Sequence, residues 1–179
     1  ILKVPSFPSN GAGTDAYNCF SIPTGLTQDR IIRAFEVVPN DPSLVHHVVI
    51  KVDSTGSSTS NTSGGCLSQP GDYDLDVYAI GGAPTVFPGQ APLKCGIRLK
   101  AGSKLNMQVH YPPGTAGIID STQIRIFFYP PGATGVRTVY VSTPLQNWNM
   151  FIFANTTPTY TAQYPSSGGL PVALSVFGA

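Results

Sequence analysis

Residues 44–50, with the sequence LVHHVVI, place two histidines side by side within a run of branched apolar residues. Valine and isoleucine favour extended backbone, so this stretch predicts a buried or half-buried β-strand over residues 44–52. An imidazole inside such a strand needs hydrogen-bond partners or a metal ion to offset the cost of leaving water. The chain contains three histidines in 179 residues. The adjacent pair, His46 and His47, is therefore the first candidate for a functional site.

Short apolar runs of the same kind recur along the chain, separated by turn clusters such as Pro-Pro-Gly at residues 112–114. The 19 glycines and 17 prolines suit many turns rather than long helices, and no window shows a sustained helical period. The chain is therefore predicted to be all-β, an antiparallel β-sandwich or jelly-roll-like domain. Besides residues 44–52, strands are predicted at 31–38, 75–80, 96–99, 105–111, 123–129, 137–141, 150–153 and 172–177.

A domain boundary is predicted near the Pro- and Gly-rich residues 130–135. Residues 1–132 would form the first β-sandwich. Residues 133–179 hold three of the predicted strands, which are too few to close a sandwich by themselves. We expect them to begin a second, incomplete β domain; the alternative is that they complete the first one.

The composition argues against several classes of partner and favours a secreted protein. Charged residues make up 11% of the chain and the net charge is +1, so electrostatic binding to nucleic acid or anionic lipid has little support. No apolar run approaches the roughly 18 residues that cross a bilayer. The chain begins at Ile1 without a signal-peptide hydrophobic region, as expected of a processed secreted protein or of an excised fragment. The glycosylation sequons at Asn61 and Asn155 fit a secreted exterior.

The three cysteines are Cys19, Cys66 and Cys95. None forms a Cys-x-x-Cys pair, which argues against a structural zinc knuckle. In a secreted chain this number predicts one disulfide and one odd thiol, and composition does not tell which cysteine is left over.

The third histidine lies in residues 105–111, LNMQVHY, where apolar and polar residues alternate. Alternation on a strand would place Leu105, Met107 and Val109 on one side and Asn106, Gln108 and His110 on the other. His110 follows His47 by 63 positions, so only the fold can bring the two together.

Two interpretations of the histidines remain open at this point. Imidazoles from the pair and from His110 would make a ligand set for copper or zinc. However, consecutive strand residues point to opposite faces, so His46 and His47 could share one ion only through a bulge, a strand end or unusual rotamers. The alternative is one packed histidine, one solvated histidine, and a His110 that is satisfied by hydrogen bonds.

Several motifs together resemble the first catalytic-core domain of the copper type II, ascorbate-dependent monooxygenases, the family of peptidylglycine α-hydroxylating monooxygenase and dopamine β-monooxygenase. The resemblance spans about residues 15–130, and its most specific part is His-His combined with Gln-Val-His-Tyr. The matching motifs are Tyr17-Asn18-Cys19, His46-His47, Tyr78-Ala79, Pro84 to Gly89, Gly102-Ser103-Lys104 and Gln108-Val109-His110-Tyr111.

The resemblance implies that His46, His47 and His110 bind one copper ion, the electron-supplying H site, with ascorbate as the reductant. It also implies that both members of the His-His pair coordinate through the ring nitrogen nearer the backbone, which answers the geometric objection. Tyr17 and Gln108 match groups that lie close to this copper in the family. The family pattern further pairs Cys19 with Cys66, which would leave Cys95 free and buried.

The family's second copper, the M site, requires a His-x-His pair and a methionine in a second domain. The sequence contains no His-x-His, and its only methionines, Met107 and Met150, do not match that ligand. Residues 169–179 resemble the strand that leads up to the pair. We therefore expect a second monooxygenase domain as partner and no hydroxylation by this chain alone.

Two functions follow as hypotheses. The first is the amino-terminal, electron-transfer portion of a secreted copper monooxygenase-like protein. The second is a non-enzymatic extracellular β-sandwich that binds copper or makes adhesive, structural or self-assembly contacts.

Overall fold

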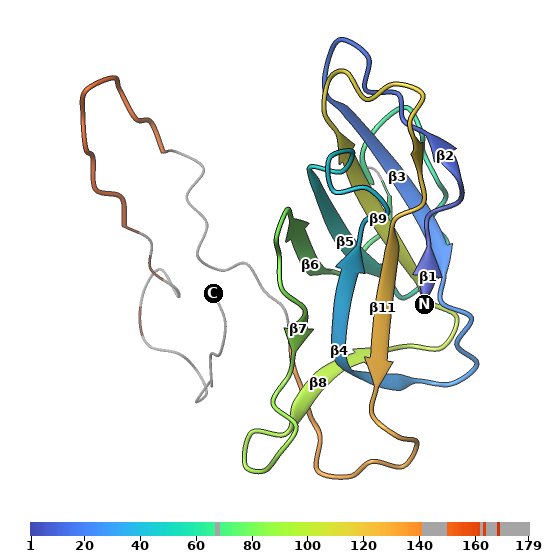
Figure 1. Cartoon of the computed structure of the whole chain (residues 1–179). Helices are drawn as coiled ribbons and strands as arrows, with labels where there is room; N and C mark the ends of the chain where they lie inside the picture. Colours follow the sequence, from blue (N-terminus) through green and yellow to red (C-terminus); the bar gives the residue numbers. More distant parts are fainter. Residues whose placement is uncertain (67–68, 141–149, 162, 164–167, 169–179) are drawn as a thin grey trace. The chain divides into compact units, whose positions relative to one another are not determined.

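The computed structural model describes residues 1–66, 69–140, 150–161, 163 and 168, and its fold is all-β (Figure 1). The chain divides into two compact units, residues 1–141 and 142–179. The strands described below belong to the first unit. The predicted all-β class with antiparallel sheets is confirmed, and the boundary after residue 132 stays a prediction.

Two sheets face each other in the first unit (Figure 1). The four-stranded sheet has the order β3-β9-β5-β6, and all its neighbours are antiparallel. Its strands are β3 (Ala16–Pro23), β9 (Lys104–Tyr111), β5 (His47–Asp53) and β6 (Tyr73–Ala79).

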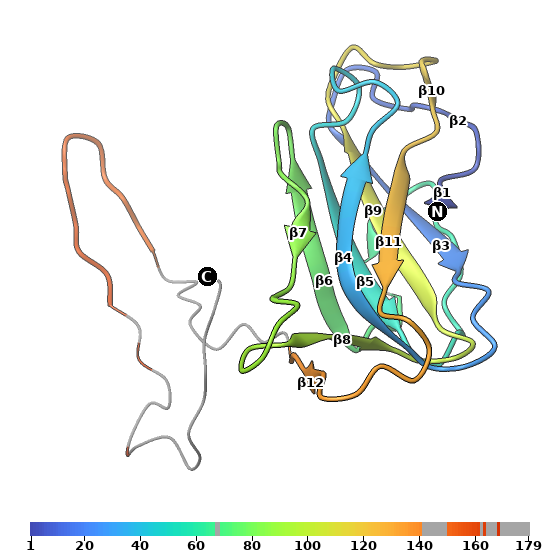
Figure 2. The same cartoon turned by 60° about the horizontal axis from the view of Figure 1, so that its bottom comes forward.

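The second, six-stranded sheet has the order β1-β11-β4-β8-β12, with β7 also paired to β4. Its last pair, β12 with β8, is parallel, whereas its other pairs are antiparallel (Figure 2). Its strands are β1 (Leu2–Lys3), β11 (Gln123–Phe128), β4 (Arg30–Val38), β8 (Cys95–Leu99), β12 (Arg137–Thr138) and β7 (Thr85–Val86). A small ribbon pairs β2 (Phe7–Pro8) with β10 (Ile119–Asp120).

The core lies between the inward faces of the two large sheets. Leu105, Met107 and Val109 of β9 belong to the core cluster, as the predicted alternation requires. Asn106, on the other side of the strand, is also fully buried, and its side chain donates to Pro70 O at 2.7 Å. In β5, Val48, Ile50 and Val52 are buried in the same cluster. The facing sheet supplies large buried side chains, namely Ile32, Phe35, Ile97, Leu99 and Ile124. Burial of apolar surface therefore orients β5 and β9 so that their remaining side chains point outward.

The strand predicted over residues 44–52 begins at His47 and therefore includes only the second histidine of the pair. An Asx turn precedes it, in which Ser43 N donates to Asp41 Oδ1 at 2.8 Å and Leu44 N donates to Asp41 O at 3.1 Å. These local hydrogen bonds replace sheet hydrogen bonds in the turn, so the strand begins after it. His46 consequently occupies a bend directly before the first strand residue.

The sequence also missed β3 and wrongly predicted a strand at residues 150–153. Asn18 is a fully buried polar residue in β3, and it interrupts the apolar alternation that would have marked the strand. Residues 150–153 are not in a strand, and their large apolar side chains are exposed. The strand predicted at 137–141 is limited to β12 among the described residues. The strand predicted at 172–177 lies outside the described residues.

A disulfide joins Cys19 of β3 to Cys66, as the family resemblance implied, and Cys95 is a free, buried thiol. The segment that leads to Cys66 also pairs with the outer edge of β3, because Cys19 and Asn61 exchange two backbone hydrogen bonds of 2.8 Å. The bridge therefore fastens this segment beside β3, the strand next to β9. No helix in the described part of the chain is long and apolar enough to cross a membrane.

The loop after β5 is organised by Asp53, whose side chain is 1% exposed. Its carboxylate accepts hydrogen bonds from Thr55 N at 2.9 Å, Thr55 Oγ1 at 2.6 Å and Ser58 N at 2.8 Å. Burial by itself would raise the pKa of Asp53, but the hydrogen bonds from Thr55 and Ser58 outweigh it and hold the pKa well below its ordinary value.

We predict that the double variant Cys19→Ala/Cys66→Ala has a lower free energy of unfolding than the wild type. The bridge spans 47 residues, and constraining an unfolded chain over such a length contributes about 4 kcal/mol. Denaturant unfolding with and without a thiol reductant measures this. Reductant should destabilise the wild type and the control Cys95→Ala, and should not affect the double variant. Equal stability of the wild type in both conditions would contradict the prediction.

We predict that Asp53 makes stability depend on pH. Its pKa is lower in the folded protein than the 3.8 of an unperturbed aspartate, so its contribution is present above about pH 4 and is lost as the pH falls below that value. Asp53→Asn leaves buried N–H donors without a charged acceptor, which should cost about 1–3 kcal/mol at neutral pH. The variant should also show a flatter loss of stability on acidification.

Denaturant unfolding over a series of pH values checks this expectation. Asp74→Asn is the control, because its carboxylate is 41% exposed and its ion-pair partner is Lys51 at 3.6 Å, so it should change stability less. An unchanged acid profile in Asp53→Asn would count against the assignment.

Candidate metal centre

The structure brings all three histidines together at one end of the four-stranded sheet. His47, the first residue of β5, lies directly opposite His110 of β9 in the antiparallel register. His46 lies one residue earlier, and its backbone N donates to His110 O at 3.0 Å. The bend at His46 removes the geometric objection, because the two neighbours are not both part of a regular strand and their rings need not point to opposite faces.

The ring nitrogens of these histidines converge. His47 Nδ1 is 3.2 Å from His46 Nδ1 and 3.1 Å from His110 Nδ1, and one donor atom from each ring lies within 4.8 Å of the others. Two nitrogens that each lie about 2.0–2.1 Å from one metal ion are roughly 2.9–3.4 Å apart when their angle at the ion is between a right angle and the tetrahedral angle. The spacing of the donor atoms therefore fits a shared metal ion.

The three rings differ in burial. His46 is exposed, His47 is half-buried and His110 is only 6% exposed. Burial lowers the pKa of His47, and the charges that His110 and His46 would carry lower it further. The lowered pKa favours the neutral imidazole of His47, which is the form that binds a metal ion.

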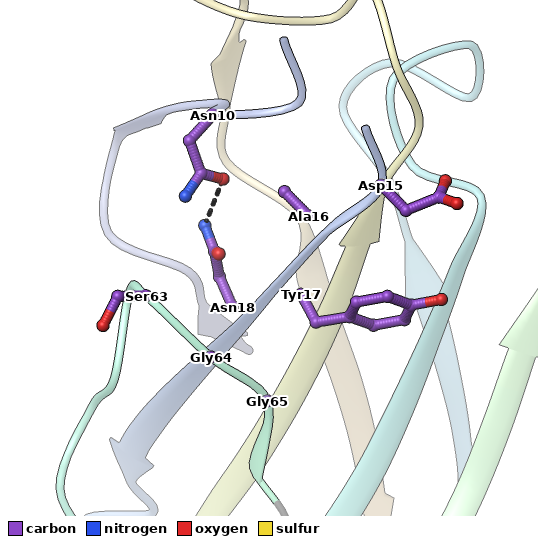
Figure 3. Close-up of a pocket in the computed structure, with 8 residues that line it drawn as sticks. All are labelled: Asn10, Asp15, Ala16, Tyr17, Asn18, Ser63, Gly64 and Gly65. Atoms are coloured by element: carbon purple, nitrogen blue, oxygen red, sulfur yellow. Dashed lines mark hydrogen bonds between the residues drawn. The ribbon is translucent and has the colours of Figure 1, made fainter. Parts of the chain in front are cut away.

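Two side chains of the neighbouring strand region hold His110. Tyr17 of β3 lies opposite His110 in the register, and their rings stack with centroids 4.4 Å apart and planes 10° from parallel. Asp15 Oδ1 is 2.8 Å from His110 Nε2. Figure 3 shows that the side chains of Asp15 and Tyr17 project to the same side of the chain, as expected for positions two residues apart.

Asp15 is a residue of this site that the sequence did not reveal. It lies 95 residues from His110, and no motif connects the two. The available signal was its place two residues before Tyr17, directly before a strand that was itself not predicted.

Gln108 lies on the same outward face as His110 but is engaged elsewhere. Its Oε1 accepts a hydrogen bond from Cys66 N at 2.8 Å. Gly65 packs so closely on this amide that a Cβ there would lie 2.2 Å from Gln108 Oε1. Gln108 therefore ties the disulfide segment to β9. Within the described residues, Gln108 makes no hydrogen bond to an imidazole, and its influence on a bound metal stays a prediction.

An open hollow adjoins the site along β3 (Figure 3). Asn10 and Asn18, whose side-chain amides are hydrogen-bonded to each other at 2.9 Å, lie on the opposite side of the strand from Asp15 and Tyr17. The remaining lining comes from Ala16 and from Ser63, Gly64 and Gly65 of the disulfide segment. Asp15 and Tyr17 are part of this lining, which combines polar and apolar surface.

Neither the models of known protein families nor the curated proteins match this chain. The family resemblance in the motifs therefore stays a prediction. The geometry by itself establishes a coarser result, which is a cluster of three histidines that could bind a metal ion.

Proposed function

We propose that this chain carries the electron-transfer copper site of a secreted, copper- and ascorbate-dependent monooxygenase-like protein. The single observation that carries the proposal is the convergence of donor nitrogens from His46, His47 and His110. The chain contains three histidines, and all of them lie in this cluster. Chance packing gives no reason for such convergence, whereas a shared ion does.

The chemistry of the donor set favours copper. Imidazole nitrogens suit copper and zinc, and divalent copper binds a given set of nitrogen ligands more tightly than the other first-row divalent ions. Asp15 is engaged with the far nitrogen of His110, and the cysteines are either bridged or free and buried. The ligands would therefore be three imidazoles. Bound copper would supply one-electron redox chemistry.

The residues of the chain would hold this ion and leave it accessible to a reductant. Tyr17 and Asp15 orient the buried His110, and the strand register holds His47 beside it. His46 is exposed, so a small reductant such as ascorbate could approach the cluster from its side. These features support an electron-transfer role.

The oxygen-activating step would need a second copper site on a partner domain. The sequence has no His-x-His pair, and the described residues form one group of potential metal ligands. We therefore propose a second monooxygenase domain as the partner that binds substrate, and we expect this chain alone not to hydroxylate.

One observation favours the alternative of a non-enzymatic copper-binding or structural module. The edge strand β6 exposes Val77 to 59%, and Ile80 directly after it is 60% exposed. Apolar side chains on a sheet edge are suited to contacts with other chains or with further copies of this one. The two functions differ in whether the bound copper is reduced by ascorbate.

We predict that the purified chain binds one cupric ion and that His110→Ala weakens this binding. Losing one of three ligands should reduce affinity by more than the about 10–100-fold that is typical of changes outside the ligand set. Metal analysis and electron paramagnetic resonance measure stoichiometry and the type 2 cupric signal, and added ascorbate should abolish the signal. The control Val86→Ala truncates an exposed residue of the other sheet.

Equal copper binding by wild type and His110→Ala would refute the assignment of His110. Copper that binds at the histidines but is not reduced by ascorbate would favour the non-enzymatic module.

We also propose that the protein is secreted and glycosylated. A disulfide is typical of oxidising compartments. Asn155 is exposed, whereas Asn61 is half-buried and its Oδ1 accepts from Ser63 N and Oγ at 3.1 Å.

We predict that Asn155→Gln and Asn61→Gln each remove one N-linked glycan from protein secreted by eukaryotic cells, because each change destroys one sequon. Intact-mass measurement before and after enzymatic deglycosylation detects this, and the double variant should show no shift on deglycosylation. A wild-type protein whose mass does not change on deglycosylation would contradict the prediction.

A further inference from the structure

We infer that Asp15 is a positioning residue of the histidine cluster, which selects the tautomer of His110 and thereby turns its Nδ1 into a metal ligand. The inference deepens the proposed function and rests on it for its consequence, which is metal affinity. The tautomer of His110 that it specifies belongs to the metal-free protein.

The first step is the direction of the hydrogen bond. An ionised carboxylate accepts hydrogen bonds and cannot donate them. Because Asp15 Oδ1 lies 2.8 Å from His110 Nε2, the proton of a neutral His110 ring belongs on Nε2. The lone pair is then on Nδ1, the nitrogen that lies 3.1 Å from His47 Nδ1. Asp15 therefore leaves the inward-facing nitrogen free to bind.

The second step is that two contacts define the ring completely. The parallel stacking of Tyr17, with planes 10° apart, restricts the plane of the His110 ring. Stacking alone would still allow the ring to flip and exchange its Nδ1 and carbon edges. The hydrogen bond from Nε2 to Asp15 removes that freedom, because a flipped ring would lose its partner.

His110 is the histidine of the cluster that depends most on a side-chain hydrogen-bond partner. It is 6% exposed, so water cannot readily supply a partner for Nε2. In contrast, His46 is exposed and His47 is half-buried, and no carboxylate is bonded to either ring within the described part of the chain. The carboxylate also places a negative charge beside a ring that would donate electron density to a cation, which strengthens the ligand.

The position of Asp15 makes the role separable from folding. Its side chain is 54% exposed, and it precedes β3 rather than forming part of it. Truncation of the carboxylate should therefore leave the core intact.

The test compares Asp15→Ala and Asp15→Glu with wild type, and uses Asp74→Ala as the matched control. Asp74 is a partly exposed aspartate of the same sheet whose partner is Lys51, at 3.6 Å, so its loss changes the net charge equally without touching a histidine. Long-range proton–nitrogen NMR correlations on metal-free protein labelled with nitrogen-15 report the tautomer of His110. Titration with Cu(II) and separately with Zn(II) reports affinity.

We expect the Nε2–H tautomer at His110 in wild type and in the control, and a mixture of tautomers in Asp15→Ala. We expect Asp15→Ala to lower the affinity for both ions about 10- to 100-fold, and Asp15→Glu to recover most of the loss. Asp15→Ala leaves the buried Nε2 of His110 without its partner, so the unfolding temperature should fall modestly while the protein stays folded. A folded variant with weakened metal binding separates positioning from loss of structure.

A wild-type His110 that carries its proton on Nδ1 would overturn the inference, and this measurement needs no variant to fold. Unchanged affinity in Asp15→Ala would overturn it as well, while leaving the proposed metal site standing. If wild type bound neither ion, the proposed function would fail, and the tautomer measurement would still decide the role of Asp15.

Discussion

The antiparallel pairing of β5 with β9 is the constraint on which the site depends. Hydrophobic burial decides the register, because Leu105, Met107 and Val109 must face the core together with the inward side chains of β5. A slip by one residue would turn every one of these side chains to solvent. With that register set, His47 and His110 are opposite each other. The histidines thus meet as a consequence of core packing, without a local sequence signal that joins them.

The position at which β5 begins is as important as its register. If the strand had continued to residue 44, neighbouring histidines would have pointed to opposite faces of the sheet. Because of the Asx turn at Asp41 and the bend at His46, the strand begins only at His47. Leu44 and Val45 remain fully buried, so the bend does not expose the apolar residues that precede it. A strand terminus is therefore what allows adjacent residues to offer nitrogens to one point.

The strand β3 provides the stacking residue and the disulfide anchor beside the histidine cluster. Its pairing with β9 places Tyr17 against His110. The Cys19–Cys66 bridge and the hydrogen bond from Cys66 N to Gln108 hold the neighbouring segment in place. Side chains two residues apart serve different purposes, because Gln108 supports the disulfide segment while His110 faces the other histidines. This explains how a site with an exposed histidine can still have a rigid and largely buried member.

The sequence by itself determined the all-β class, most of the long strands, the outward face of β9 and, through its motifs, the pairing of Cys19 with Cys66. The first three follow from alternation and turn composition, which are local, whereas the cysteine pairing was implied by the resemblance of the motifs to a known family. It did not reveal β3, because buried Asn18 breaks the alternation, and it placed a strand at residues 150–153 where apolar residues lie exposed. Only the tertiary structure decided that the donor nitrogens of His46, His47 and His110 converge and that Asp15 holds His110 from 95 residues away. Such contacts depend on strand order, register and chain ends, and no local pattern encodes which distant residues those will bring together.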